Sequence, residues 1–203
     1  MKPHYKSVFD KETDLLKAVI DVHLDGADIE CDPMYFKGNF YKDGVKRPTH
    51  IFDLNPQVPE CPKGDATCLN IGTGKLRSII LDPPFMFGLH GKTREYYSSK
   101  THTIYTDYPE LLKSYDAIIS ESHRVLKPKG ILIFKCQDYT DSKTTMVHID
   151  VHNIATGKGF VADDLGILVR PNKVTNPNTK QRHLRKIHTY FYIFRKVKPF
   201  GSI

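Results

Sequence analysis

The chain has 203 residues, 39% hydrophobic and 26% charged, which is ordinary for a soluble globular protein and suits one domain over residues 1–203. No run of 18 apolar residues occurs and the N-terminus lacks the apolar core of a signal peptide, which excludes a membrane span and predicts a cytoplasmic protein. Thirty Lys and Arg residues against 23 Asp and Glu give a net charge of +7, a weak indication of a polyanionic partner.

The first half of the chain predicts one helix followed by short strands. Residues 10–24 place Leu, Val and Ile on one side of a helix. Residues 27–31, 50–54 and 77–81 are apolar or mixed segments of about five residues, and each ends at an Asp-Pro or Asn-Pro pair. Short apolar runs that are stopped by proline are typical of buried parallel strands.

The second half alternates helices with strands and ends on two strands. We expect helices over residues 108–126 and 144–156, and strands over residues 131–134, 161–169 and 188–195. The last two strands follow each other directly, which predicts a hairpin. This order of elements indicates an α/β fold, a mostly parallel sheet with helices on both faces and a C-terminal antiparallel hairpin.

The four residues Asp82-Pro83-Pro84-Phe85 are the sharpest chemical signal in the sequence. They directly follow the predicted strand 77–81, at the end of a strand where open α/β sheets place their sites. The plainer interpretation is a turn that ends the strand, with the aromatic ring buried in the core.

These residue types suit the methylation of an amino group on a base. The lone pair of such a nitrogen is delocalised into the ring, so the amine is a poor nucleophile. The Asp82 carboxylate and the Pro83 carbonyl could accept both of its N–H groups and turn the lone pair towards a methyl donor. Proline fixes φ and thereby the direction of the carbonyl. Phe85 could stack on the target base.

Several stretches together resemble one enzyme family. Residues 79–85 resemble motif IV of the amino-methyltransferases that make N6-methyladenine or N4-methylcytosine in DNA. Residues 28–40, 51–54 and 64–66 resemble motifs I, II and III of that family, in the expected order. Residues 124–138 are similar to a helix–turn–strand stretch in its phage and bacterial members.

The resemblance covers about residues 27–196 and implies the seven-stranded, Rossmann-like class I methyltransferase fold in unpermuted order, with S-adenosylmethionine as cofactor. Motif I would hold the methionine part of the cofactor, Asp53 the ribose hydroxyls and Asp65 the adenine amine. Phe36 stands where motif I normally has its first glycine, so the turn differs in shape or approaches the cofactor less closely. The residues implied in cofactor binding are Asp32, Pro33, Gly38, Asn39, Phe40, Asp53, Leu54, Asp65 and Ala66, and those implied in catalysis are Asp82, Pro83, Pro84 and Phe85.

Two loops are candidates for contact with nucleic acid. Residues 86–107 interleave basic residues with tyrosines, which suits phosphate contact with base stacking. Residues 170–188 contain six Lys or Arg residues and no acid, and their Pro and Asn residues predict a loop. Both segments also fit ordinary solvated loops. The candidate contact residues are Lys92, Arg94, Lys100, Arg182, Arg185 and Lys186.

The function expected from this resemblance is methylation of DNA, with adenine N6 ahead of cytosine N4 and with a homodimer or a separate specificity partner. A restriction enzyme could accompany it. An RNA base methyltransferase is the main alternative, and a non-catalytic nucleic-acid-binding module on the same fold is another. A glutamine-directed protein methyltransferase would more often carry Asn-Pro-Pro-Tyr. No metal site is expected, because His148 and His152 stand one helical turn apart without a third ligand.

Overall fold

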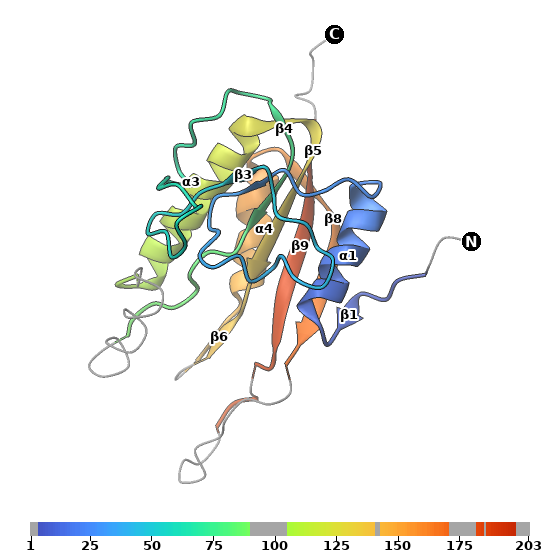
Figure 1. The fold of residues 1–203 in the computed structure, drawn as a ribbon. Coiled ribbons are helices and arrows are strands. Elements are labelled where there is room, and N and C mark those ends of the chain that lie inside the picture. Colours follow the sequence, from blue (N-terminus) through green and yellow to red (C-terminus); the bar gives the residue numbers. More distant parts are fainter. Residues whose placement is uncertain (1–3, 90–104, 141–142, 171–181, 185, 198–203) are drawn as a thin grey trace.

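The computed structural model describes residues 4–89, 105–140, 143–170, 182–184 and 186–197, and its centre is a seven-stranded sheet (Figure 1). The strands lie in the order β1-β8-β9-β5-β4-β2-β3. Their bounds are β1 (Val8–Phe9), β2 (Cys31–Asp32), β3 (His50–Ile51), β4 (Leu76–Leu81), β5 (Leu126–Cys136), β8 (Phe160–Val169) and β9 (His188–Lys196). A separate two-stranded sheet pairs β6 (Tyr139–Thr140) with β7 (Thr144–Thr145).

The pairing confirms the predicted sheet. β3, β2, β4 and β5 are joined by parallel pairings, and β1 is parallel to β8. β9 is antiparallel to both of its neighbours, β5 and β8, so β8 and β9 form the expected hairpin. The sheet is therefore mostly parallel, with the antiparallel strand inserted between β5 and β8.

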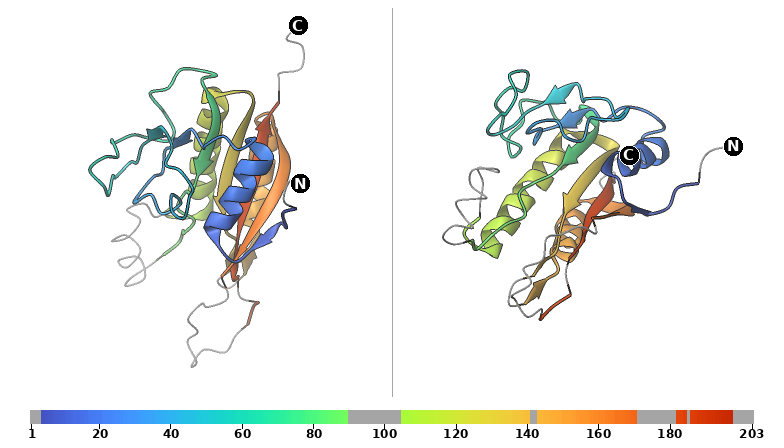
Figure 2. Two further views of the ribbon diagram at one scale, coloured as in Figure 1. Left: turned by 45° about the vertical axis from the view of Figure 1, so that its right-hand side comes forward. Right: turned by 60° about the horizontal axis from the view of Figure 1, so that its bottom comes forward.

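In the part of the chain that is described, three helices cover the two faces of the sheet, close to the predicted bounds. α1 (Glu12–His23) lies across the sheet from α3 (Tyr108–Val125) and α4 (Val147–Gly157) (Figure 2). α3 begins cleanly because the Asp107 side chain accepts a hydrogen bond from the Glu110 backbone N–H. In the described ranges, no helix is long and apolar enough to cross a membrane.

The part of the sheet around β2 and β3 is more irregular than predicted. Each of these strands has two residues where five were expected, and residues 33–49 and 52–75 contain no helix. Turns and bends, many of them beside a proline or glycine, replace the crossover helices that a doubly wound sheet normally carries here. The seventh strand of the sheet is β1, which the sequence pattern did not predict.

β5 begins five residues earlier than predicted. Its pairing with β4 shifts between Leu76 and Ser78, so the residues after Leu126 bulge out before regular pairing resumes at Ile131. Lys129 takes a left-handed backbone conformation in this bulge, with φ at +67°.

The sheet separates the two large clusters of the core, and a third, small cluster is formed by Tyr35, Ile51 and Cys61 in the described residues. Phe134 of β5 packs with Tyr115 of α3 on one face, and Ile133 packs with Leu15 and Leu16 of α1 on the other. Side chains alternate between the faces of a strand, so a strand covered on both faces must be apolar at successive positions. This explains the run Ile131-Leu132-Ile133-Phe134.

A charged pair at the end of α3 fixes the segment that leads into β4. Arg124 donates to the backbone carbonyls of Leu69 and Ile71 at 3.1 and 2.8 Å, and it also donates to both oxygens of Glu121. Glu121 is buried and accepts from the Leu69 backbone N–H. The hydrogen bonds from Arg124 lower the pKa of Glu121 in spite of its burial.

Replacing Arg124 with Met should destabilise the fold by about 1–3 kcal/mol, because Glu121 and two backbone carbonyls lose a charged donor. Urea unfolding at neutral pH measures this effect. Lys113→Met, on an exposed position of the same helix, is the control and should leave the free energy of unfolding nearly unchanged. Equal stabilities of the two variants would show that the pair contributes nothing.

Candidate active site

The carboxyl ends of the parallel strands bring the predicted chemical residues to one edge of the sheet. Asp82 follows β4, Asp32 ends β2, and Asp53 lies two residues after β3. β4 and β5 pair with Leu81 opposite Phe134, which sets Asp82 beside Lys135. The ligand sites of open α/β sheets lie at this edge.

Asp82 is held by an ion pair that the motif alone does not reveal. Lys135 Nζ donates to Asp82 Oδ2 at 2.8 Å and lies 2.9 Å from Glu12 Oε1, in the first turn of α1. The contact with Glu12 is an ion pair without hydrogen-bond alignment. Arg170 approaches the same Glu12 oxygen at 3.4 Å. Two acids and two bases from four parts of the chain therefore meet here.

Burial and charge act in opposite directions on Asp82. Burial raises the pKa of its carboxyl, and the neighbouring Lys135 opposes that rise while Glu12 adds to it. Burial also acts to lower the pKa of Lys135, but the two carboxylates raise it overall. Lys135 therefore stays charged.

The rest of the motif is also fixed in direction. The Tyr115 hydroxyl, on a fully buried side chain of α3, donates to the Pro84 carbonyl at 3.1 Å. Pro83 is buried, and Phe85 is half-buried. Phe87 then forms an isolated bridge with Tyr105, so both ends of the segment between them lie beside the motif.

The turn after β2 is built around a buried acid. Asp32 accepts from the Met34 backbone N–H at 2.9 Å and from the Tyr41 hydroxyl at 2.6 Å. Burial raises the pKa of Asp32 to about 7 in spite of these bonds. Phe36 has φ at +50°, so it adopts the left-handed conformation that the expected glycine would supply. The turn keeps that backbone shape without the glycine.

Gly38 is required by packing within the same turn. Its φ is +66°, and a Cβ at this position would lie 2.4 Å from the Tyr35 hydroxyl oxygen. The rings of Tyr35 and Tyr41 stack at 5.6 Å, so tyrosines fill the inside of the turn. Asn39, beside this glycine, is exposed.

Asp53 joins the turn after β2 to the segment that resembles motif III. Its Oδ2 accepts from the Phe36 backbone N–H at 2.7 Å, and its Oδ1 accepts from the Asn55 backbone N–H at 2.8 Å. Its backbone carbonyl accepts from Gly64 N–H. A carboxylate has about four acceptor positions, so Asp53 keeps capacity for the two hydroxyls of a ribose. The residues present therefore fit the expected cofactor at this point.

The other candidate cofactor residues differ in their surroundings. Phe40 is buried in the α1-side core, with its ring against Phe191 of β9. Asp65 is exposed and accepts from Thr67. The remaining candidates are Pro33 and Ala66, which are buried, and Leu54, which is exposed.

Only part of the candidate nucleic-acid contact set can be placed. Lys92, Arg94, Lys100 and Arg185 lie outside the described residues. Arg182 is exposed and Lys186 is half-buried. β8 and β5 are both antiparallel to β9, so they run in the same direction, and β8 ends at the edge of the sheet that carries Asp82.

Three residues that the sequence did not predict belong to the site by their side-chain contacts. Lys135, Glu12 and Tyr115 all contact the motif or its ion pair. One signal was available: Lys135 is a charged residue directly after the apolar run 131–134, at the same level as Asp82 in the expected sheet. Glu12 and Tyr115 carry no such signal, because an acid in a first turn and an aromatic on a helix face are common.

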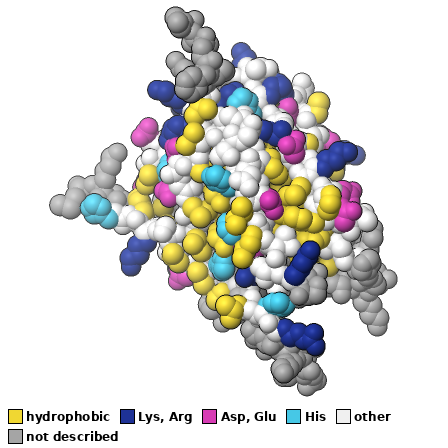
Figure 3. Space-filling model, turned by 180° about the vertical axis from the view of Figure 1, so that it is seen from behind, with side chains coloured by type: hydrophobic (Ala, Val, Ile, Leu, Met, Phe, Trp, Pro, Cys, Tyr) yellow, Lys and Arg dark blue, Asp and Glu magenta, His cyan; other side chains and the backbone are white. Residues whose placement is uncertain are grey.

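A second polar cluster lies on the α4 side of the sheet. Asp138 is buried and accepts from His148, whose ring stacks on Tyr190 at 4.3 Å, and the Tyr190 hydroxyl contacts His188. The view from behind shows histidines among hydrophobic side chains on that face (Figure 3). In the part of the chain that is described, no group of three His, Cys, Asp or Glu residues could hold a metal ion.

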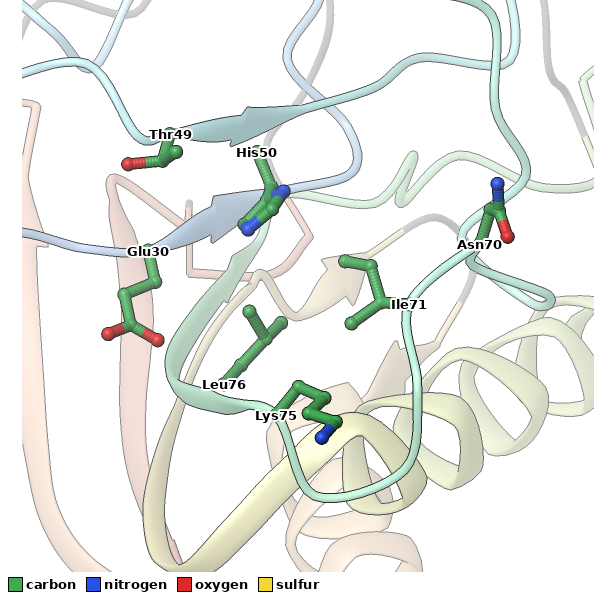
Figure 4. A pocket seen from close by; sticks show the side chains of 7 residues that line it. All are labelled: Glu30, Thr49, His50, Asn70, Ile71, Lys75 and Leu76. Carbon is green, nitrogen blue, oxygen red and sulfur yellow. The ribbon is translucent and has the colours of Figure 1, made fainter.

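A pocket lies at the opposite edge of the sheet and does not contain this chemistry. Its volume is about 420 Å³, and His50 and Leu76, the first residues of β3 and β4, lie in its wall (Figure 4). The side chains that line it are those of Glu30, Thr49, His50, Asn70, Ile71, Lys75 and Leu76. Because Asp82 follows the other end of β4, the pocket is separate from the motif.

A family model described as DNA methylase, of the N6 and N4 methyltransferase type, matches residues 76–201. The chain belongs to this family. Membership confirms the resemblance seen in the sequence, with S-adenosylmethionine as the cofactor of this class of enzyme. The match includes Asp82 and Lys135 but begins after the segments that resemble motifs I to III. No curated protein sequence matches the chain.

Solved structures are similar to the chain at low sequence identity, and the first of the following shares its fold. The 1,6-didemethyltoxoflavin N1-methyltransferase of Burkholderia thailandensis is 14% identical with a TM-score of 0.55, covering 93% of this chain and 80% of its own. A Thermus thermophilus protein described as a DNA modification methylase is 17% identical with a TM-score of 0.48, covering 69% of this chain and 55% of its own. The cytosine-N4-specific PvuII DNA methyltransferase is 16% identical with a TM-score of 0.49, covering 66% of this chain and 48% of its own. The methylase thus spans about half the length of the two DNA-directed structures.

The raised pKa of Asp32 should appear in the pH dependence of stability. The folded state keeps a proton on this carboxyl that the unfolded state releases near pH 4, so the contribution to stability is lost as pH rises towards 7. Between pH 5 and 8, the free energy of unfolding of wild type should fall by roughly 2–3 kcal/mol relative to that of Asp32→Asn, whose amide does not titrate.

Urea unfolding of both proteins at the two pH values measures this difference. Asp28→Asn, in an exposed ion pair with Lys46, is the matched control and should follow wild type. Parallel pH dependences of wild type and Asp32→Asn would contradict the prediction.

Proposed function

We propose that this methylase transfers a methyl group from S-adenosylmethionine to the exocyclic amine of a base in DNA, with adenine N6 ahead of cytosine N4 as the acceptor. The observation that carries the proposal is Asp82-Pro83-Pro84-Phe85 at the carboxyl end of β4, with one carboxylate oxygen fixed by Lys135 and the backbone fixed by Tyr115. Membership of the DNA methylase family supports DNA as the substrate.

In this reaction the chain aligns the target amine and accepts its hydrogen bonds. The amine nitrogen forms a bond to the methyl carbon while the carbon–sulfur bond breaks and its electron pair stays on sulfur. The nitrogen then loses one proton to Asp82 or to water. Asp82 and the Pro83 carbonyl orient the lone pair, and Phe85, which is half-buried, offers a ring face to the base.

The cofactor supplies an activated methyl group when bound. We propose that Asp53 accepts from the ribose hydroxyls and that the turn from Asp32 to Gly38 lies against the methionine part. The contact between Asp53 and the Phe36 backbone N–H supports this placement, because it fixes the acid against the turn. Asp65 is proposed to accept from the adenine amine.

Asp82→Ala should reduce methyl transfer by at least about a hundredfold, because the amine loses its charged acceptor. Cofactor affinity, measured by calorimetry, should change little, since the proposed ribose acid is Asp53. Mass spectrometry of nucleosides from DNA of the expressing host distinguishes N6-methyladenine from N4-methylcytosine. Asp116→Ala, at an exposed position on α3, is the control.

Methylated nucleosides in the RNA fraction and none in the DNA would favour an RNA base methyltransferase. Cofactor binding without methylation of either would favour a non-catalytic binding module. Activity of Asp82→Ala within a few-fold of wild type would overturn the role given to this carboxylate.

The basic segment after β8 is proposed to contact the DNA backbone. Flipping a base out of a duplex costs a few kcal/mol, which phosphate contacts must offset. Replacing Arg182, Arg185 and Lys186 together with Ala should weaken binding at every DNA sequence. The slope of its salt dependence should fall by up to about 0.9 for each phosphate that is no longer neutralised. Cofactor affinity should stay unchanged.

A salt series of DNA-binding measurements tests this, with Lys42→Ala, Lys46→Ala and Lys63→Ala combined as a control of equal charge. If the two triple variants behave alike, the segment has no special part in binding, and the contact would shift to Lys92, Arg94 and Lys100. We further propose that a second copy of the chain or a separate specificity partner helps to read the recognition sequence.

A further inference from the structure

The ammonium group of Lys135 is confined on several sides. Its Nζ contacts Asp82 Oδ2 at 2.8 Å and Glu12 Oε1 at 2.9 Å, and it lies 4.9 Å from the centre of the Phe40 ring and 5.7 Å from that of Phe191. The side chain is 17% exposed. Two carboxylates and two ring faces therefore leave the ammonium little freedom to move.

The pair is asymmetric at the motif. Among the described residues, the hydrogen bond to the Asp82 carboxylate comes from Lys135 and falls on Oδ2. The Asp82 side chain is 34% exposed, so a bound molecule can reach this carboxylate although one of its oxygens is paired with Lys135. An oxygen fixed by a charged donor on one side sets the direction of the other oxygen of the same carboxylate.

We propose that Lys135 is a positioning residue for methyl transfer: it holds Oδ2 of Asp82, with Glu12 holding Lys135 in turn, and so presents Oδ1 to the target amine. This inference rests on the proposed function. It extends the site from the four-residue motif to a chain of ion pairs, Asp82–Lys135–Glu12, that links β4, β5 and α1.

The charges that face Asp82 decide at which pH its carboxylate takes up a proton. Lys135 faces it from β5, Glu12 from α1, Arg170 from the segment after β8, and Asp32 from the end of β2. Lys135 and Arg170 favour the ionised carboxylate, and Glu12 opposes it. Asp32 keeps its own proton up to about pH 7, so it adds no charge on the acid side. Since transfer requires the carboxylate as an acceptor, activity is lost on acidification as Asp82 takes up a proton.

Two variants should therefore move the acid limb of the activity profile in opposite directions. Lys135→Met removes a positive charge, so the limb should move to higher pH and kcat should fall by about tenfold to a hundredfold. Glu12→Gln removes a negative charge, so its limb should move to lower pH. KM for DNA and for the cofactor should change much less than kcat in Lys135→Met.

Controls separate this role from simple stability. Lys135→Arg keeps the charge, so its acid limb should stay near that of wild type even where kcat falls. Lys127→Met, on an exposed position of the same strand, should match wild type throughout. If Lys135→Met does not fold, Glu12→Gln still tests the proposal. An acid limb of the Glu12→Gln activity profile that is unchanged or lies at higher pH than that of wild type overturns it.

The outcomes also separate this inference from the proposed function. A wild-type protein that binds cofactor and DNA but methylates neither base would refute the function itself. A wild type that methylates DNA, with a Lys135→Met profile superimposable on its own, would leave the function intact and refute only the positioning role.

Discussion

Parallel pairing of β4 with β5, in the register that sets Leu81 opposite Phe134, determines where a reaction can take place on this protein. Residues 79–81 of β4 pair with residues 132–134 of β5 and all six are apolar, and the first charged side chains after this segment are Asp82 and Lys135. The two therefore emerge at the same level and form a pair at 2.8 Å. A shift of the register by one residue would move Lys135 to the opposite face of the sheet.

Around β2 and β3, hydrogen bonds from the backbone to acidic side chains take the place of regular secondary structure. Residues 33–75 contain no helix, yet their backbone is tied together by acids that accept from it: Asp32 from Met34, Asp53 from Phe36 and Asn55. Buried polar groups need partners, and here the side chains supply what helices would otherwise provide. The acids expected to face the cofactor also hold their own loops in shape.

Periodicity and proline stops predicted the three helices, the hairpin and the place of the chemical motif, because these depend on local patterns. The lengths of β2 and β3 could not be predicted, since apolar residues near a proline look alike in a strand and in a buried turn. Phe36 shows the same limit. Its left-handed conformation depends on the turn around it, which no single residue type reveals. Glu12 could not be assigned to the site, because 70 residues separate it from Asp82 and only the packing of α1 brings it there.

The cage around Lys135 uses side chains from almost the whole length of the chain: Glu12 near the start, Phe40 after β2, Asp82 after β4 and Phe191 in the last strand. Contacts between residues so distant in sequence form late, because each closes a long loop. The ammonium group is thus confined only when both ends of the fold are in place. Catalytic competence and global folding should then be lost in a single step, with no partly folded form that retains turnover.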